Sequence, residues 1–343
     1  MSAGPSRQCD EAESAGSAGD GLAAILQDAM ARRLARDEED RRDKRKRRLG
    51  SPRVPPQVQP QPQPTERLGG GFVPKKRAAT QPVWRDDHPL DFVFENPLDG
   101  KFKELSAVAE LLRDFPQLVR QVATSYCHYG YDYRKRTVFV SSVGAFQPLP
   151  PCPGNPCAHA RARSRHPAQV VECDAGQKNS LPPALIDLLV ESWRRRRGAG
   201  WRFLIVDVFS GWGSLGKRVA EKHRNGEWVD VVGVYANDLV QRDHTDTTLD
   251  MGVISVDTLV AFAVARHFPE SRPSAGLTRW LQREKIAVLI HLSTPCDTYS
   301  VVGLRSHRVG STLEPKTAMA RDHDAMNTML TQYVRRAVLA PVP

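Results

Sequence analysis

The chain of 343 residues has no apolar run long enough to cross a bilayer as a helix. Its first residues include acids and lack a short hydrophobic core, so we expect no secretory leader. Six cysteines in a chain of this length are too few for a disulfide framework. We expect them to be reduced thiols, available for catalysis or metal binding. These absences favour an intracellular protein that does not associate with membranes.

Charge, by contrast, is present in excess. Lys and Arg outnumber Asp and Glu by 49 to 39, which gives a formal net charge of +10 and a sequence pI of about 9.5. A basic balance favours a polyanionic partner. We interpret the dense basic run Arg41–Arg48 as a nuclear address or a nucleic-acid clamp, with a solvated linker as the alternative. We therefore expect a nucleic acid as the polyanionic partner and the nucleus as the location.

Composition divides the chain into two regions. Residues 1–84 are rich in Ser, Gly, Ala, Gln and Pro without a regular apolar period, so we predict a disordered tail. Within it, the apolar spacing of Leu22–Arg36 fits a short amphipathic helix, and Pro55–Pro64 favours polyproline geometry. Residues 85–343 are predicted to form one folded domain, with halves at 85–197 and 198–343.

Apolar runs in this domain alternate with helical patterns. Five segments have strand patterns: Asp91–Glu95, Arg136–Ser141, Phe203–Val208, Val231–Tyr235 and Ile286–Leu292. Two segments have the spacing of helices: Phe102–Val122 and Pro182–Trp193. The alternation is typical of an α/β fold with a parallel sheet.

A Gly-rich turn at Ser210–Gly216 follows the strand Phe203–Val208 and precedes a helix. Glycines there let the backbone approach a ligand closely, and a helix amino terminus favours negative charge. Its glycines also fit a dinucleotide fingerprint, which makes a nicotinamide dehydrogenase an alternative. Asp238 ends the next strand, where a carboxylate can accept hydrogen bonds from ribose hydroxyls; a helix cap is its alternative role.

A cysteine follows the last predicted strand, in the segment Ser293–Ser300 (STPCDTYS). A thiol in that position lies at the sheet edge where α/β proteins place ligands, and its thiolate can be stabilised there. A buried structural cysteine is the alternative. The preceding proline and the polar residues that follow favour a nucleophile at Cys296.

Six short motifs together resemble those of the C5-cytosine DNA methyltransferase family. They are the cofactor motif at Asp207–Leu215, the ribose-binding strand at Val234–Asp238, the catalytic loop at Pro295-Cys296, the Glu-Asn motif at Glu95-Asn96, the base-holding strand at Tyr129–Phe139 and the Asn-Ser helix after Asn179-Ser180. The match extends over about residues 86–325.

The motifs stand in a rotated order. In the family, the chain runs from the cofactor motif through the Pro-Cys loop and the Glu-Asn strand to the Asn-Ser helix, whereas here Glu95 comes first and Cys296 last. The resemblance implies a Rossmann-like, S-adenosylmethionine-dependent methyltransferase sheet in circularly permuted form; a window of a tandem array is the alternative. The strand Asp91–Glu95 should then lie beside Ile286–Leu292 and parallel to it. Asn179 and Ser180 should approach the Gly-rich turn.

The resemblance also implies roles for single residues. The thiolate of Cys296 would attack C6 of a flipped-out cytosine, Glu95 would act as the acid at N3, and C5 would accept the methyl group. Cofactor-binding roles are implied for Asp207, Phe209, Ser210, Gly211, Gly213, Ser214, Leu215, Asp238, Asp250, Asn179 and Ser180. Substrate-binding roles are implied for Asn96, Arg134, Lys135, Arg136 and Ser300.

Two other functions are compatible with these motifs. One is the same chemistry on RNA cytosine. The other is a catalytically inactive, nucleic-acid-binding relative, which is favoured by departures from the family pattern at Asp297, Tyr299 and the base-holding residues Tyr133–Thr137.

A Cys/His-rich segment is a candidate metal site. Four residues separate Cys152 from Cys157, and His166 and Cys173 follow, a donor set suited to tetrahedral zinc. The segment has few apolar residues, a deficit that a metal would remedy. The loose spacing leaves an irregular loop without metal as the alternative. We expect Cys127 to lie outside this cluster and to pack in the core.

Overall fold

The computed structural model describes residues 88–154, 157, 166, 180–252, 254–270, 276–294, 306–309, 312 and 314–338. All of them belong to one compact unit, Thr80–Pro343. The predicted tail lies outside the described residues, as do four of the predicted site residues: Asn179, Cys173, Cys296 and Ser300.

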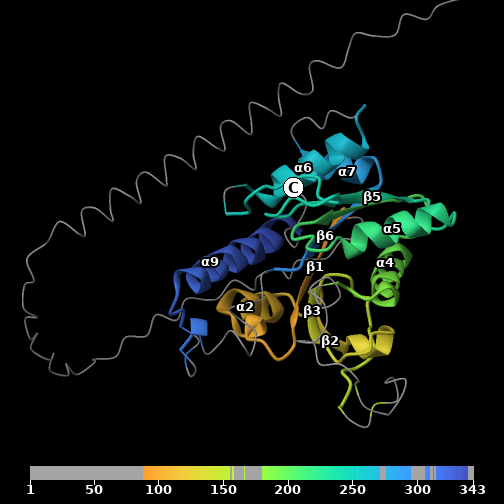
Figure 1. Cartoon of the computed structure of the whole chain (residues 1–343). Coiled ribbons are helices and arrows are strands. Elements are labelled where there is room, and N and C mark those ends of the chain that lie inside the picture. The colour runs from red at the N-terminus through yellow and green to blue at the C-terminus, as the bar shows by residue number, and fades with distance from the viewer. Residues whose placement is uncertain are drawn as a thin grey trace, which may run out of the picture. The chain divides into compact units, whose positions relative to one another are not determined.

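A six-stranded sheet in the order β2-β3-β1-β6-β4-β5 forms the centre of this unit (Figure 1). The strands are β1 (Leu90–Pro97), β2 (Arg120–Ser125), β3 (Arg136–Ser141), β4 (Arg202–Asp207), β5 (Val231–Ala236) and β6 (Ile286–Leu292). Strands β1, β6, β4 and β5 are parallel, whereas β3 is antiparallel to both of its neighbours. The α/β prediction is confirmed, and the arrangement is compatible with a Rossmann-like fold. The prediction of a parallel sheet is wrong for β3, because its connection from β2 is too short for a parallel crossover and β3 therefore runs opposite to both β2 and β1.

The predicted pairing of Asp91–Glu95 with Ile286–Leu292 is confirmed. In β1 and β6 the residues pair in parallel from Leu90 with Val288 to Phe94 with Leu292. Their carboxyl ends therefore lie at the same edge of the sheet.

Helices connect and cover these strands. They are η1 (Phe102–Glu104), α2 (Ser106–Asp114), η2 (Tyr126–Tyr129), α4 (Pro183–Arg197), α5 (Ser214–Arg224), α6 (Val256–His267), α7 (Leu277–Arg283), α9 (Ala318–Tyr333) and η4 (Val334–Val338). A single helix over Phe102–Val122 is wrong. Pro116 follows the end of α2 closely and cannot continue it, and the β-branched residues beyond it suit strand β2.

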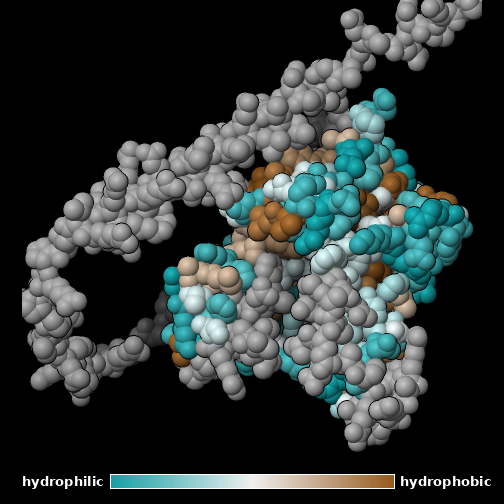
Figure 2. Space-filling view, viewed as in Figure 1, coloured by the Kyte–Doolittle hydropathy of each residue, from teal (hydrophilic) through white to brown (hydrophobic). Residues whose placement is uncertain are grey.

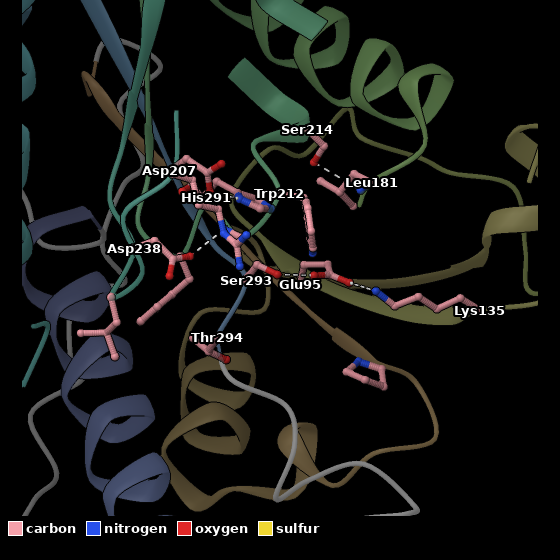
Figure 3. A pocket seen from close by; sticks show the side chains of 16 residues that line it. Glu95, Lys135, Leu181, Asp207, Trp212, Ser214, Asp238, His291, Ser293 and Thr294 are labelled. Carbon is pink, nitrogen blue, oxygen red and sulfur yellow. Dashed lines mark hydrogen bonds and ion pairs between the residues drawn. The ribbon is translucent and has the colours of Figure 1, made fainter. Parts of the chain in front are cut away.

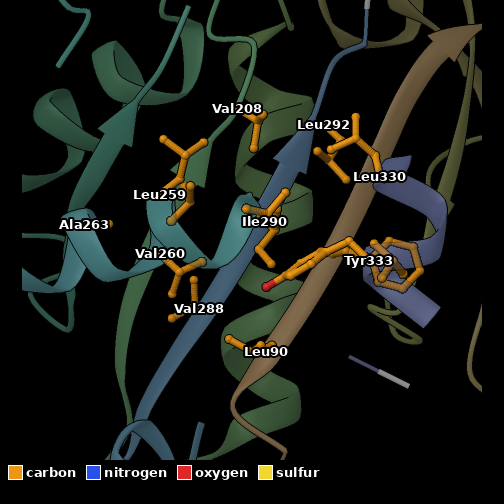
Figure 4. Close-up of a cluster of buried hydrophobic side chains, with 14 of the residues drawn as sticks. Leu90, Val208, Leu259, Val260, Ala263, Val288, Ile290, Leu292, Leu330 and Tyr333 are labelled. Atoms are coloured by element: carbon orange, nitrogen blue, oxygen red, sulfur yellow. The ribbon is translucent and has the colours of Figure 1, made fainter. Parts of the chain in front are cut away.

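Side chains alternate between the two faces of the sheet, and each face has its own hydrophobic core. One core joins Val288 and Ile290 of β6 to residues of α2, α6 and α9, among them Leu330 and Tyr333 (Figure 4). The other joins the intervening residue Leu289 to α4 and α5. All seven residues of β6 are buried, which explains the continuous apolar run of this central strand.

The outer surface of α5 is hydrophilic (Figure 2). Its buried side chains are Leu215 and Val219, and the remaining positions are mostly charged or polar. Among the described residues, no helix combines the length and the apolarity needed to cross a membrane.

Candidate functional site

A pocket of about 370 Å³ lies where β1, β4 and β6 end (Figure 3). Its lining comes from six parts of the chain: Glu95, Pro97, Lys135, Leu181, Asp207, Phe209, Ser210, Gly211, Trp212, Ser214, Asp238, Leu239, Arg242, His291, Ser293 and Thr294. The carboxyl edge of a parallel sheet is where α/β proteins bind ligands. We therefore take this pocket as the candidate active site.

Glu95 is a buried carboxylate held by three donors on one wall of the pocket. Its Oε1 accepts a hydrogen bond of 3.0 Å from the Tyr126 hydroxyl and lies 3.4 Å from Lys135 Nζ, while the Ser293 hydroxyl donates to Oε2. Lys135 Nζ also lies 4.8 Å from the centroid of the Tyr126 ring. The three donors thus come from η2, from the segment before β3 and from the end of β6.

These surroundings favour the charged form of Glu95. Burial alone would raise the pKa of its carboxyl group, but the Lys135 charge opposes burial and, with the Ser293 hydrogen bond, holds the pKa below its ordinary value. The charge of His291 and the Tyr126 hydroxyl contribute in the same direction. Glu95 is therefore an acceptor in the free protein.

Asp207 and His291 form a second polar pair on the floor of the pocket. Their strands are neighbours, and His291 Nδ1 lies 2.8 Å from Asp207 Oδ1, with both residues buried. Burial alone would lower the pKa of His291, but Asp207 and then Glu95 raise it above its ordinary value. The arrangement aligns Glu95, His291 and Asp207 along the ends of three adjacent strands.

The Gly-rich turn forms the opposite wall. Gly211 and Gly213 have φ of 52° and 67°, left-handed values that favour glycine. A Cβ on Gly213 would come within 2.3 Å of the His244 ring, so only glycine fits there. The Gly211 amide donates a 2.7 Å hydrogen bond to Asp238 Oδ2, which fastens the turn to the end of β5.

Asp238 does not cap a helix, since Val240 and the residues after it form a loop. Its Oδ1 accepts from the Val240 amide at 3.0 Å, and each carboxylate oxygen can accept a further hydrogen bond. Beside it, the Arg242 guanidinium lies 4.5 Å from the centroid of the Trp212 ring. This side of the pocket therefore combines acceptors with an aromatic surface.

The end of β1 is tied directly to the end of β6. Asn96 Nδ2 donates a 2.9 Å hydrogen bond to Thr294 Oγ1. Cys296 lies outside the described residues, but the chain enters its segment from Ser293 and Thr294, which line the pocket. Leu181, the residue after Asn179-Ser180, contacts the helix that follows the Gly-rich turn, since its amide donates a 3.3 Å hydrogen bond to Ser214 Oγ.

Several predicted residues are not among those that line the pocket. They are Asn96, Arg134, Arg136, Ser180, Gly213, Leu215 and Asp250. Leu215 belongs to the hydrophobic core, and Arg136 pairs with Asp99 near the surface. Asp250 accepts a hydrogen bond from the Gly252 amide. Conversely, sequence reasoning missed Tyr126, His291 and Ser293, whose residue types alone carry no signal for this site.

The Cys/His cluster contains Cys127, and its predicted exclusion is wrong. The ligand atoms of Cys127, Cys152, Cys157 and His166 all lie within 4.8 Å of one another. Cys152 Sγ lies 3.4 Å from Cys157 Sγ and 3.7 Å from His166 Nε2. Burial and the two neighbouring thiols raise the pKa of Cys127 to about 12. Its position after Tyr126, distant in sequence from the other three, hid this membership.

Comparison with known proteins gives no family for the chain. No family model, no curated protein and no solved structure matches it. The geometry of the site is therefore the basis for assigning a function.

Proposed function

We propose that the pocket binds S-adenosylmethionine and that the chain transfers its methyl group to C5 of cytosine in DNA. The observation that carries this proposal is the convergence of the predicted motifs on one pocket. Glu95, the strand leading to Cys296, the Gly-rich turn and Asp238 come from separate parts of the sequence, and all border the same 370 Å³ cavity. A nicotinamide dehydrogenase would have no role for Glu95 or Cys296.

The strand order supports a circularly permuted arrangement. Read from β4 onward, through β5 and β6 and then to β1, the four parallel strands have the spatial order second, first, third, fourth. This is the order of a doubly wound sheet, in which ligands bind between the first and third strands. Those strands are β4 and β6, and the pocket lies at their ends.

The Gly-rich wall suits the cofactor. Asp238 would accept hydrogen bonds from the ribose hydroxyls, and Trp212 would pack against the flat adenine ring. When bound, the sulfonium group supplies an electrophilic methyl group. Gly211 lines the cavity without a side chain, which leaves room for the ligand beside the turn.

The other wall suits the base. The Cys296 thiolate would attack C6 of the ring, which raises electron density at C5. C5 would take the methyl group as its bond to sulfur breaks, and loss of the C5 proton would then release the thiolate from C6. Because Glu95 is ionised in the free protein, it would first accept a hydrogen bond from the exocyclic amino group of cytosine. It would supply a proton to N3 only after taking one up itself. Lys135 and Tyr126, which contact its carboxylate, would therefore influence when Glu95 becomes protonated.

Transfer of a labelled methyl group from the cofactor tests this proposal, with separate DNA and RNA pools as acceptors. We expect label in DNA, and a rate at least about 100-fold lower for Glu95→Gln because the base loses its charged partner. Asp99→Asn, which changes an exposed carboxyl just beyond β1, should leave the rate unchanged. Label in RNA alone would favour the RNA alternative. Cofactor binding without methyl transfer would favour an inactive relative. The absence of both cofactor binding and methyl transfer would contradict the proposal.

We also propose zinc as the ion for the Cys/His cluster. Three thiols and one imidazole are a donor set that zinc takes in structural sites. Tetrahedral zinc places its ligand atoms roughly 3.5–3.8 Å apart, given Zn–S of about 2.3 Å and Zn–N of about 2.0 Å. The 3.4 and 3.7 Å separations around Cys152 are close to these values.

Metal analysis of the purified chain tests the ligand set. We expect one zinc per chain in the wild type and in Cys173→Ser, and loss of zinc in Cys127→Ser. Retention in Cys127→Ser with loss in Cys173→Ser would overturn the assignment of Cys127.

A further inference from the structure

We infer that the metal centre positions the pocket wall that holds Glu95, so that metal occupancy governs handling of the base but not binding of the cofactor. This inference rests on the proposed zinc site and the proposed reaction. Its structural basis is the short segment 125–136, from the last residue of β2 to the first residue of β3, which contributes Cys127 to the cluster and Tyr126 and Lys135 to the surroundings of Glu95.

Adjacent residues of this segment serve the two sites. Tyr126 donates to Glu95, and Cys127, the next residue, contributes to the cluster. The Tyr126 amide also donates a 3.0 Å hydrogen bond to the Lys135 carbonyl. A shift of Cys127 therefore moves both Tyr126 and Lys135, the residues that hold the Oε1 atom of Glu95.

The loop that carries Cys152 is also hydrogen-bonded to this segment. The Cys152 amide donates a 2.9 Å hydrogen bond to Ser125 Oγ, and the Leu149 amide donates a 2.8 Å bond to the Tyr129 hydroxyl. The chain from residue 149 to Cys157 otherwise contains no helix or strand in its described part. A metal bound by Cys127, Cys152 and Cys157 would therefore convert a loop held by a few hydrogen bonds into a rigid support.

The cofactor wall stands apart from this support. Gly211, Trp212 and Asp238 lie at the ends of β4 and β5, and β6 and β1 separate these strands from β3 and the segment before it. Loss of the metal should therefore affect the wall of Glu95 selectively.

Hydrogen exchange of the full chain, with and without a chelator, tests the positioning role independently of activity. We expect amide exchange in the peptide spanning residues 125–136 to rise at least about tenfold on metal removal, while α6 stays unchanged. Unchanged exchange in this segment, or an equal rise throughout the domain, would overturn the inference.

Two ligand measurements separate the walls. Removing the metal should slow covalent trapping of a DNA duplex that contains 5-fluorocytosine by about tenfold or more, while binding of S-adenosylhomocysteine changes less than about twofold. Equal losses in trapping and in cofactor binding would mean that the metal supports the whole fold. This result would contradict a selective effect on the wall of Glu95.

Tyr126→Phe provides a variant that keeps every metal ligand. It should retain zinc and slow trapping by about tenfold, because Glu95 loses one donor. Metal removal should then slow trapping by a smaller factor in this variant than in the wild type, since both changes act through the contact between Tyr126 and Glu95. An equal factor in both backgrounds would exclude that contact as the connection. If the wild type traps no DNA, the proposed reaction fails, while the exchange experiment still decides whether the metal holds the segment.

Discussion

Strand β1 carries a buried carboxylate at each end, and the two have opposite surroundings. Asp91 and Glu95 are four residues apart, so both point to the face of the sheet that α4 and α5 cover. At the amino end, every partner of Asp91 is part of the packed structure. At the carboxyl end, Glu95 shares two of its partners, Lys135 and Ser293, with a pocket.

Asp91 is held in a buried network of hydrogen bonds and ion pairs, called here the Asp91 joint, with Ser142, Trp193, Arg196 and Arg197. It accepts hydrogen bonds from Trp193 Nε1 at 3.0 Å and from the Ser142 hydroxyl at 2.9 Å, and it pairs with Arg196 and Arg197. The Arg197 and Asp91 side chains are both fully buried. The contrast teaches that burial and charge pairing alone do not mark a reactive carboxylate. An adjoining cavity and partners that a ligand can reach are also required.

Breaking the Asp91 joint should give the largest effect on stability. Asp91→Ala leaves the buried Arg197 guanidinium without its charge partner, which should lower the free energy of unfolding by about 3–5 kcal/mol. Denaturant unfolding measures this change. Asp99→Ala, which removes the partially exposed Arg136 pair, serves as the control and should cost about 1 kcal/mol or less. A similar loss of unfolding free energy in both variants would show that the contacts of Asp91 stabilise the fold no more than an ordinary surface ion pair.

Cofactor affinity should depend on the far wall of the pocket. Asp238→Ala should weaken binding of S-adenosylhomocysteine by about 1–3 kcal/mol, because it removes the ribose acceptor and the anchor of Gly211. Calorimetry would measure the affinity. Asp243→Ala, a change in the exposed part of the next loop, should leave it unaltered. Unchanged affinity in Asp238→Ala would place the cofactor elsewhere.

The pH dependence of stability should distinguish Glu95 by its sign. Since its folded pKa lies below the ordinary value of 4.5, its contribution is present above that value and is lost as the pH falls through the folded pKa. Lys135→Met removes the charge that opposes burial, so the pKa of Glu95 should rise and this acid-side loss should diminish or reverse.

Unfolding experiments from about pH 6 down to about pH 3 would follow this change. Lys101→Met, which breaks a surface pair with Glu104, is the matched control and should keep the wild-type profile. An unchanged loss of stability at low pH in Lys135→Met would show that Lys135 does not set the ionisation of Glu95.

The regular parts of the fold were predictable because local patterns decide them. The apolar run of Ile286–Leu292 gave the bounds of β6, and the six motifs predicted that β1 would lie beside it. The turn glycines were identified because their backbone conformation excludes other residues. The strand and turn patterns depend on a few neighbouring residues at a time, whereas the β1–β6 pairing followed from the order of the motifs.

The missed features depend on contacts between distant segments. Tyr126 reaches Glu95 across 31 positions, and His291 meets Asp207 across 84. Four consecutive arginines, Arg194–Arg197, carry no sequence signal for burial, yet two of their side chains pair with Asp91. Cys127 joins the Cys/His cluster because the segment between β2 and β3 packs against Leu149 and Cys152. Composition and spacing do not specify such pairings.

Identification of the covalent adduct tests the central claim most directly. Incubation of the chain with S-adenosylmethionine and a duplex containing 5-fluorocytosine should give a stable protein–DNA product, because fluorine at C5 blocks release of the base. Peptide mass analysis should place the bond on Cys296, and Cys296→Ser should form no product while it still binds the cofactor. An adduct on another residue, or none from a wild-type chain that binds S-adenosylmethionine and DNA, would contradict cysteine-mediated methyl transfer at this pocket.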